Sequence, residues 1–263
     1  MIPRRYIEEW KEFAPWPDDS QVEQDLVIER ALADLFSDDM IRKNLAFRGG
    51  TALHKLFLKP QVRYSEDIDL VQITAEPIGP ILKKIRERLS FLGQKRTVKP
   101  KKFNNTIVYT FDTEIEPVVK MKLKIEINCI EHFTVLGYQD IQHVVKNSWF
   151  ESSNTIVSYQ LEELLGTKLR ALYQRRKGRD LFDLYWAYQN AKIDTDKLIT
   201  CYNEYMKKSV PQPPTQKEFL LNMEEKMQDK EFTNDIHVIL RPGVEYDNQK
   251  AYEFIKTELI EKI

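Results

Sequence analysis

Cysteine is scarce in this sequence, histidine is rare, and long hydrophobic runs are absent. The two cysteines, Cys129 and Cys201, lie far apart and have neither the spacing of a zinc site nor that of a redox motif. No segment is apolar enough for a membrane span, and the first residues, MIPRRYIEEWKEF, lack the apolar stretch of a secretory signal. We therefore expect a cytoplasmic protein with reduced thiols and no association with a membrane.

Charge of both signs, by contrast, is plentiful. The chain has 263 residues, of which 42% are hydrophobic and 31% charged, a composition typical of one large or two modest globular domains. The formal net charge of -1 conceals a segregation, because acidic residues predominate over 17–40 whereas 81–102 and 168–179 are rich in lysine and arginine. Such basic groups can bind nucleic-acid phosphates or can be the solvated faces of helices, and for 81–102 both interpretations stay open.

Hydrophobic periodicity divides the chain into two halves. Residues 20–36 have the spacing of an amphipathic helix, NLAFRGG and IDLVQI that of short strands, and TALHKLFLK between them that of a helix. A helix over 79–92, strands over 106–113 and 118–128 and a short extended connection at NTIVSYQ follow. The spacing is then helical over 161–176, 179–189, 195–208, 216–228 and 247–262, with a break at PQPPT. The pattern predicts an α+β protein, with a core over 1–155 and a helical domain over 156–263.

Two carboxylates stand one residue apart in RYSEDIDLV, at 63–71. Because side chains alternate along a strand, Asp67 and Asp69 project to the same side and can share divalent cations. The preceding Gly49-Gly50-Thr51 could bring backbone N–H groups and a hydroxyl to a polyphosphate. Alone, the pair is more often a charged strand start, but the glycines favour a metal-dependent nucleotide site. Glu126, on the polar face of KLKIEIN, is the candidate for a third acidic group.

These segments resemble a known enzyme family. FRGGTALHK followed by RYSEDIDL is similar to the first motif of the nucleotidyltransferase superfamily in its AbiEii/AbiGii toxin branch. ELLGTKLRALYQRRKGRDLFDLYWA, at 163–187, resembles later helices of that branch, which carry a lysine and an RDxxD-like element. The resemblance covers roughly 47–187. It implies a nucleotidyltransferase-like core with a mixed β-sheet flanked by helices, plus a C-terminal helical domain that contributes to the active site.

The resemblance also assigns roles to individual residues. It implies a phosphate loop at Gly49, Gly50 and Thr51, a triphosphate contact at Ser65, metal ligands at Asp67, Asp69 and Glu126, and a triphosphate-binding lysine at Lys168. Asp180 and Asp183 fall in the last motif, where one aspartate is functional; Asp180 is favoured as catalytic, with Asp183 as a nucleotide contact. Arg175 and Arg179 could join Lys168 around the phosphates, or could belong to a solvated basic stripe.

The activity implied by the resemblance is transfer of a nucleoside monophosphate from an NTP to an acceptor hydroxyl. Mg²⁺, or alternatively Mn²⁺, is the implied cofactor, an RNA such as the 3′ end of tRNA the acceptor, and a cognate antitoxin the partner protein. Two alternatives stay open. One is nucleotidyl or phosphoryl transfer to a small molecule or a protein, and the other is an inactive binding module that retains the fold.

Overall fold

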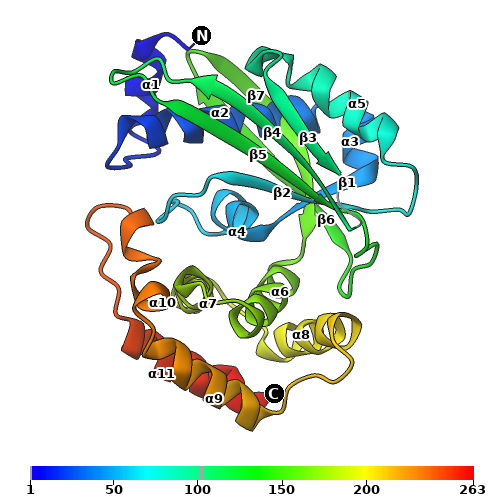
Figure 1. The fold of residues 1–263 in the computed structure, drawn as a ribbon, viewed down its shortest axis with the longest axis vertical. Helices are drawn as coiled ribbons and strands as arrows, with labels where there is room; N and C mark the ends of the chain where they lie inside the picture. Colours follow the sequence, from blue (N-terminus) through cyan, green and yellow to red (C-terminus); the bar gives the residue numbers. More distant parts are fainter. Residues whose placement is uncertain (1, 101–102) are drawn as a thin grey trace. The chain divides into compact units, whose positions relative to one another are not determined.

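The structure is a computed structural model that describes residues 2–100 and 103–263 and divides into two compact units (Figure 1). Unit 1 comprises Met1–Phe133 and Tyr138–Tyr159, and unit 2 comprises Thr134–Gly137 and Gln160–Ile263. Lys101 and Lys102, at the end of the basic group 81–102, lie outside the described residues. No helix in the described ranges combines the length and apolarity that a membrane span requires.

Unit 1 is built on a seven-stranded mixed sheet in the order β3-β4-β5-β2-β1-β7-β6. The pairs β2–β5 and β1–β7 are parallel, and the other neighbours are antiparallel. The strands are β1 Leu45–Arg48, β2 Asp67–Gln72, β3 Arg96–Pro100, β4 Asn104–Asp112, β5 Lys120–Asn128, β6 Tyr138–Asn147 and β7 Phe150–Tyr159. The mixed sheet and the helices around it confirm the α+β class predicted from the sequence.

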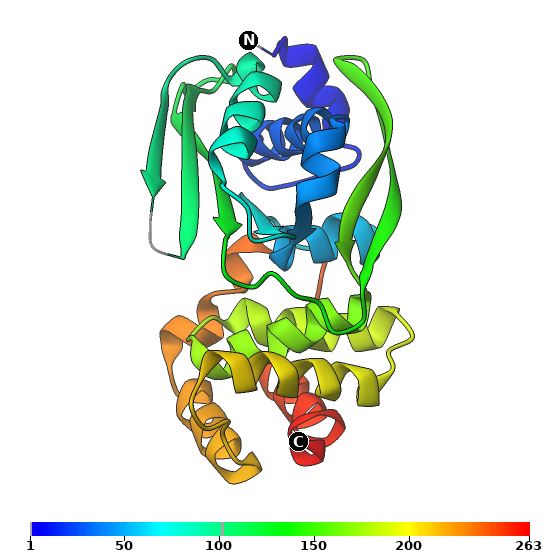
Figure 2. The same ribbon diagram turned by 90° about the vertical axis from the view of Figure 1, so that its right-hand side faces the viewer.

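The helices of unit 1 gather on one side of this sheet. The long helix α2 packs against β5, β6 and β7, and the sheet curves around it, with β3–β4 on one flank and β6–β7 on the other (Figure 2). A capping box between Asp18 and Gln21 fixes the start of α2. The helices are α1 Arg4–Trp10, α2 Asp19–Phe36, α3 Asp39–Asn44, α4 Gly49–Ala52 and α5 Gly79–Arg88, with a π-helical turn at Leu53–Phe57 and a 3-10 turn at Ser90–Leu92.

Unit 2 is helical, and one carboxylate ties its parts together. Glu163 accepts hydrogen bonds from the backbone N–H groups of Val135 and Leu136 and from the hydroxyl of Tyr205. α6 and α8 approach closely at Gly166, where an added Cβ would lie 2.7 Å from Cβ of Cys201. The helices are α6 Leu161–Gln174, α7 Gly178–Asn190, α8 Thr195–Ser209, α9 Gln216–Met227, α10 Lys230–Asn234 and α11 Asn248–Glu258.

The sequence prediction was wrong or incomplete in three segments. The helix expected over 51–59 begins at Gly49 and becomes π-helical at Leu53. The expected connection NTIVSYQ is the second half of β7, which pairs along its length with the unpredicted strand β6. The inward positions of β6 include His143 and Asn147, so apolar alternation is missing there. β3 was also not predicted, since RTVKP has a single apolar side chain apart from its proline.

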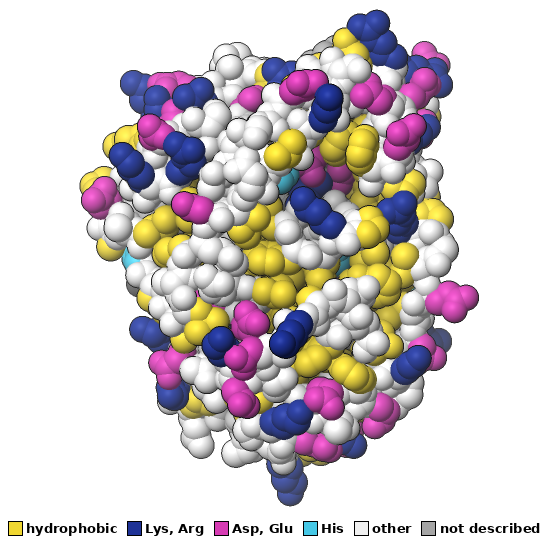
Figure 3. Space-filling view, turned by 180° about the vertical axis from the view of Figure 1, so that it is seen from behind, with side chains coloured by type: hydrophobic (Ala, Val, Ile, Leu, Met, Phe, Trp, Pro, Cys, Tyr) yellow, Lys and Arg dark blue, Asp and Glu magenta, His cyan; other side chains and the backbone are white. Residues whose placement is uncertain are grey.

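Acidic and basic residues are segregated along the chain, but they are mixed on at least one side of the molecule. Figure 3 shows basic and acidic side chains interspersed on the side turned away from the viewer of Figure 1. Part of the acidic group 17–40 is buried, with Glu23, Asp25 and Glu29 all inside unit 1. Local sequence charge is therefore a poor guide to surface charge here.

Candidate active site

The two aspartates of RYSEDIDLV lie at the start of β2, as the sequence predicts. Ile68 and Leu70 are buried, whereas Asp67 and Asp69 are partly exposed, so the alternation of the strand turns both carboxylates to the face away from the core. The parallel neighbour β5 adds a third carboxylate, because Glu126 is directly in register with Asp69. The sheet thus places all three predicted acidic residues on one face of unit 1.

A lysine lies among these carboxylates. Lys124 is in register with Asp67, and its Nζ is 3.3 Å from Oδ2 of Asp67 and 3.1 Å from Oε2 of Glu126. Burial acts to lower the pKa of Lys124, but the two carboxylates outweigh it and the net pKa is raised. The sequence analysis did not assign Lys124 a role, although strand alternation puts it on the same face as Glu126. The lysine is an internal counter-charge for two of the three carboxylates.

Gly49 leaves room for Asp69. Its φ is +80°, and a Cβ built on it would lie 2.3 Å from Oδ2 of Asp69, so the carboxylate packs directly on the glycine backbone. Gly50 and Thr51 follow in the short helix α4. The Thr51 hydroxyl donates to the carbonyl of Asp67 at 2.6 Å and is 2.6 Å from Oγ of Ser65. Thr51 and Ser65 therefore fix the loop against the first residue of β2.

The remaining predicted residues form a buried ion cluster within unit 2. Nζ of Lys168 on α6 is 2.9 Å from Oδ1 of Asp180 and 2.7 Å from Oδ2 of Asp183, both on α7. Lys168 is 6% exposed and the two aspartates 0%. Burial raises the pKa of Asp180, but Lys168 and Arg175 outweigh this effect and lower it. Both aspartates of the last motif thus bind the same lysine, a pairing that the sequence could not reveal.

With this geometry in hand, the chain can be compared with known proteins. The family described as "Nucleotidyl transferase AbiEii toxin, Type IV TA system" matches residues 30–256. The chain belongs to the AbiEii family. It is therefore a nucleotidyltransferase of a toxin–antitoxin family, as the resemblance of its motifs predicted. No match was found among curated protein sequences.

Solved structures share the fold of this AbiEii chain. MenT4, a nucleotidyltransferase toxin from Mycobacterium tuberculosis H37Rv, has a TM-score of 0.66 and 14% sequence identity, over 98% of this chain and 88% of MenT4. JHP933 from Helicobacter pylori has a TM-score of 0.53 and 15% identity, over 93% of this chain and 95% of JHP933. At such low identity the likeness concerns the fold, so the roles of individual residues have to be argued from their own geometry.

The carboxylates of the AbiEii chain suit a metal held jointly with a substrate. Within residues 2–100 and 103–263, no three acidic, histidine or cysteine side chains are preassembled as a complete metal cage. Mg²⁺ is typically bound by one or two carboxylates together with substrate phosphates, so a complete cage is not required. The donor atoms of Asp67, Asp69 and Glu126 are all hard oxygens, and Gly49 has no side chain to occupy the space beside Oδ2 of Asp69. This donor set fits Mg²⁺ or Mn²⁺.

A second ion network, which the sequence analysis missed, connects the segment after the glycine loop of the AbiEii site to α2. Lys55, in the π-helical turn after α4, places Nζ 3.1 Å from Oδ2 of Asp25 and 2.8 Å from Oε1 of Glu29, both on α2. Nε2 of His143 lies 3.0 Å from the other Glu29 oxygen. Burial disfavours the charged form of Glu29, but Lys55 and His143 prevail and lower its pKa to about 2. The network joins the turn that follows the glycines to the main helix of unit 1.

The arginines near Lys168 are engaged inside unit 2. Nε of Arg175 is 2.5 Å from Oδ2 of Asp180, and Arg179 donates to both oxygens of Asp235, at 3.0 and 3.1 Å. Arg175 thus adds a second cation to the Lys168 cluster, and Arg179 pairs with an aspartate that has no described contact with Lys168. A role of either arginine at the phosphates stays a prediction.

Proposed function

We propose that this AbiEii enzyme transfers a nucleoside monophosphate from an NTP to a hydroxyl of an RNA, such as the 3′ end of tRNA, with Mg²⁺ or Mn²⁺ as cofactor. The observation that carries the proposal is the convergence of Asp67, Asp69 and Glu126 on one sheet face beside Gly49. Three carboxylates from two parallel strands concentrate negatively charged oxygen atoms on this face, with Lys124 between two of them. Such a face attracts hard cations and, through them, a triphosphate.

The residues of unit 1 have different roles in the proposed reaction. Asp67, Asp69 and Glu126 hold the metal, which when bound neutralises phosphate charge and lowers the pKa of the attacking hydroxyl. The backbone of Gly49 and Gly50 approaches the phosphates, because neither residue has a side chain to obstruct them. Thr51 and Ser65 keep this loop on β2, and the Ser65 hydroxyl is a further candidate for contact with the triphosphate.

In the proposed reaction, unit 2 supplies a lysine whose position is fixed by two carboxylates. Lys168 binds the triphosphate, and Asp180 and Asp183 hold its ammonium group in one position from a single face of α7. Since the side chain is held at its tip by two buried carboxylates, little rotamer entropy is left to lose when a phosphate binds. Asp180 and Asp183 are then positioning residues for Lys168.

Family membership implies an NTP substrate and an antitoxin partner. The RNA acceptor is supported by the basic group 81–102, whose described lysines and arginines include the exposed Lys83, Arg86, Lys95 and Lys99. Cations of this kind neutralise the phosphates of a nucleic acid and release its counterions, which favours RNA over a small neutral acceptor.

A labelling experiment tests the proposed function. The protein is incubated with each of the four labelled NTPs, Mg²⁺ and a total RNA pool, and the RNA 3′ ends are then sequenced. We expect label in RNA with the wild type and loss of at least about 10³-fold with Asp69→Asn, since metal-ligand contacts contribute several kcal/mol to such reactions. Asp112→Asn, at an exposed position of β4, is the matched control and should retain full activity.

The same experiment distinguishes the alternatives. If the label enters a protein or a small molecule instead of RNA, the proposed acceptor is wrong but the role of the carboxylates stands. Equal labelling by wild type and Asp69→Asn would remove the carboxylates from the mechanism. An absence of product with all four NTPs and every acceptor would favour the binding module.

A further inference from the structure

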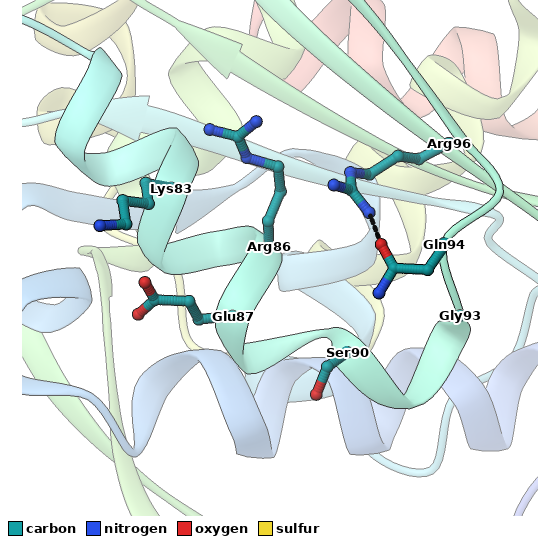
Figure 4. Close-up of a pocket in the computed structure, with 7 residues that line it drawn as sticks. All are labelled: Lys83, Arg86, Glu87, Ser90, Gly93, Gln94 and Arg96. Atoms are coloured by element: carbon teal, nitrogen blue, oxygen red, sulfur yellow. Dashed lines mark hydrogen bonds between the residues drawn. The ribbon is translucent and has the colours of Figure 1, made fainter.

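A basic pocket lies in unit 1 between α5 and the edge strand β3 (Figure 4). Its volume is about 480 Å³, and it is formed by Lys83, Arg86, Glu87, Ser90, Gly93, Gln94 and Arg96. Lys83 and Arg86 are one helical turn apart on α5, and Arg96 comes from the first position of β3. Cations from two separate elements therefore border the same cavity.

The cations of α5 fall into two classes. Lys84 and Arg88 are paired with carboxylates: Nη2 of Arg88 is 2.8 Å from Oδ2 of Asp38, and Nζ of Lys84 is 2.9 Å from Oε2 of Glu87. The hydrogen bond and the charge of Lys84 lower the pKa of Glu87, so this carboxylate already has a cationic partner.

The cations that border the pocket have neutral partners instead. Arg86 donates to the carbonyl of Leu82 and Arg96 to the side-chain amide of Gln94. Over residues 2–100 and 103–263, neither of them nor Lys83 has a carboxylate within ion-pair distance. Their charge is thus available to an external anion.

A buried tyrosine lies opposite Arg96 on the neighbouring strand. Tyr109 on β4 is directly opposite Arg96 in the antiparallel pair β3–β4 and is 1% exposed. Its hydroxyl has no hydrogen-bond partner among the described residues. Burial raises its pKa, and the positive charges of Arg96 and Arg86 act in the opposite direction, so both guanidinium groups lie within electrostatic reach of one hydroxyl.

The pocket lies on the other side of the sheet edge from the carboxylates. Glu126 is opposite Thr106, and Thr106 is opposite Lys99, so Lys99 shares the carboxylate face of the sheet. Arg96 precedes Lys99 by three residues and therefore projects from the other face. β3 is three strands from β2, which amounts to roughly 14 Å at ~4.8 Å per strand. A single NTP at the carboxylates does not extend around this edge, whereas a polynucleotide does.

The chemistry of the pocket favours a phosphate chain over a protein partner. None of its seven residues is aliphatic or aromatic. Protein interfaces are centred on buried apolar or aromatic anchors, which this cavity does not offer. Two guanidinium groups and one ammonium group, with a serine hydroxyl and an amide, are the donors that phosphodiester oxygens accept from.

We propose that Lys83, Arg86 and Arg96 bind the phosphodiester backbone of a single-stranded RNA, several nucleotides away from the hydroxyl that reacts. The proposal deepens the proposed function, since it makes the acceptor a polynucleotide that passes around the β3 edge. Lys99, exposed on the carboxylate face of the same strand, lies along that path.

Salt-dependent RNA binding tests the pocket without catalysis. Anisotropy of a labelled single-stranded RNA oligonucleotide is measured in EDTA, without NTP, over a range of salt concentrations. Three lost phosphate contacts should reduce the slope of log K against log [salt] by about 2 in Lys83→Gln/Arg86→Gln/Arg96→Gln, at ~0.7 per contact. Arg86→Gln alone should remove about 0.7, whereas Lys84→Gln, with the same change in net charge on the same helix, should leave the slope nearly unchanged.

The outcomes of this experiment test the pocket independently of the proposed reaction. A slope equal to that of the wild type in the triple variant, with its thermal unfolding unchanged, would overturn the pocket even if the enzyme still labels RNA. Loss of a co-purified antitoxin without a change of slope would make the cavity a protein-docking site and overturn the RNA proposal. A reduced slope supports the pocket even where labelling shows another acceptor for the chemistry.

Discussion

Two groups of charged side chains, one in each unit, carry the residues expected to be functional, and they are built on opposite principles. In unit 1, Asp67, Asp69 and Glu126 are partly exposed, and Lys124 pairs with Asp67 and Glu126. In unit 2, Asp180 and Asp183 are fully buried and bind Lys168, with Arg175 as a further partner of Asp180. The first group lies on a partly hydrated face, whereas the second is buried and has as many cations as carboxylates.

The difference indicates what each group is suited to do. A partly hydrated group of carboxylates can take up cations from solution at little cost in desolvation. A buried and balanced group cannot lose a member without leaving an unpaired charge in the interior. We therefore expect substitutions in unit 1 to affect chemistry more than folding, and substitutions in unit 2 to affect both.

The largest effect on stability is expected from Lys168→Met. It leaves Asp180 and Asp183 buried without their shared lysine, which should cost about 3–5 kcal/mol of unfolding free energy as well as activity. Urea denaturation measures the loss. The triple variant Lys168→Met/Asp180→Asn/Asp183→Asn should recover part of the stability but none of the activity. Equal stability of the wild type and Lys168→Met would contradict the comparison, because the cluster would then not hold the unit together.

An intermediate effect is expected from Gly49→Ala. The substitution brings a Cβ within 2.3 Å of Oδ2 of Asp69 and also forces alanine to a φ of +80°. The backbone strain alone should cost about 1–2 kcal/mol, and displacement of Asp69 should reduce nucleotide transfer beyond that. Gly243→Ala is a matched control, since Gly243 has a φ of +83° but open space around it. Gly49→Ala should be destabilised more than Gly243→Ala, because it adds the clash with Asp69 to a similar backbone strain, and only Gly49→Ala should lose activity. Similar activity in the two variants would show that Asp69 tolerates the displacement.

Much of this site was predictable from the sequence because its elements are local. Strand alternation is enough to put Asp67 and Asp69 on one face, and a glycine after a buried strand predicts the turn at Gly49. Glu126 followed from the same alternation on β5, although its register with Asp69 depends on which strands pair. The helical C-terminal half was predicted from its periodicity, whereas the mixed sheet was implied by the resemblance of the motifs.

What the sequence could not show depends on non-local pairing. The Lys55 network joins α2 to the turn after α4, and its partner His143 comes from β6, whose polar inward positions conceal the strand. The sequence analysis therefore noted the acidic residues of α2 only as part of the acidic segment 17–40 and assigned none of them a buried role. The role of Lys124 was missed for a similar reason, because a lysine in an alternating strand is usually a solvated side chain until its neighbours on other strands are known.

The smallest effect, and the one that tests the role of the lysine in the unit 1 group most directly, is expected from Lys124→Met. Removing the ammonium group leaves Asp67 and Glu126 without this counter-charge, so a divalent cation should bind more tightly. Because the lysine is partly exposed, the gain should be no more than about 5-fold, the range of a surface ion pair. Titration with Mn²⁺, followed by the paramagnetic signal of the free ion, measures it without turnover. Lys122→Met, on the same face of β5 but exposed, should change the affinity less. Weaker Mn²⁺ binding by Lys124→Met would mean that the lysine organises the carboxylates for the metal and does not compete with it.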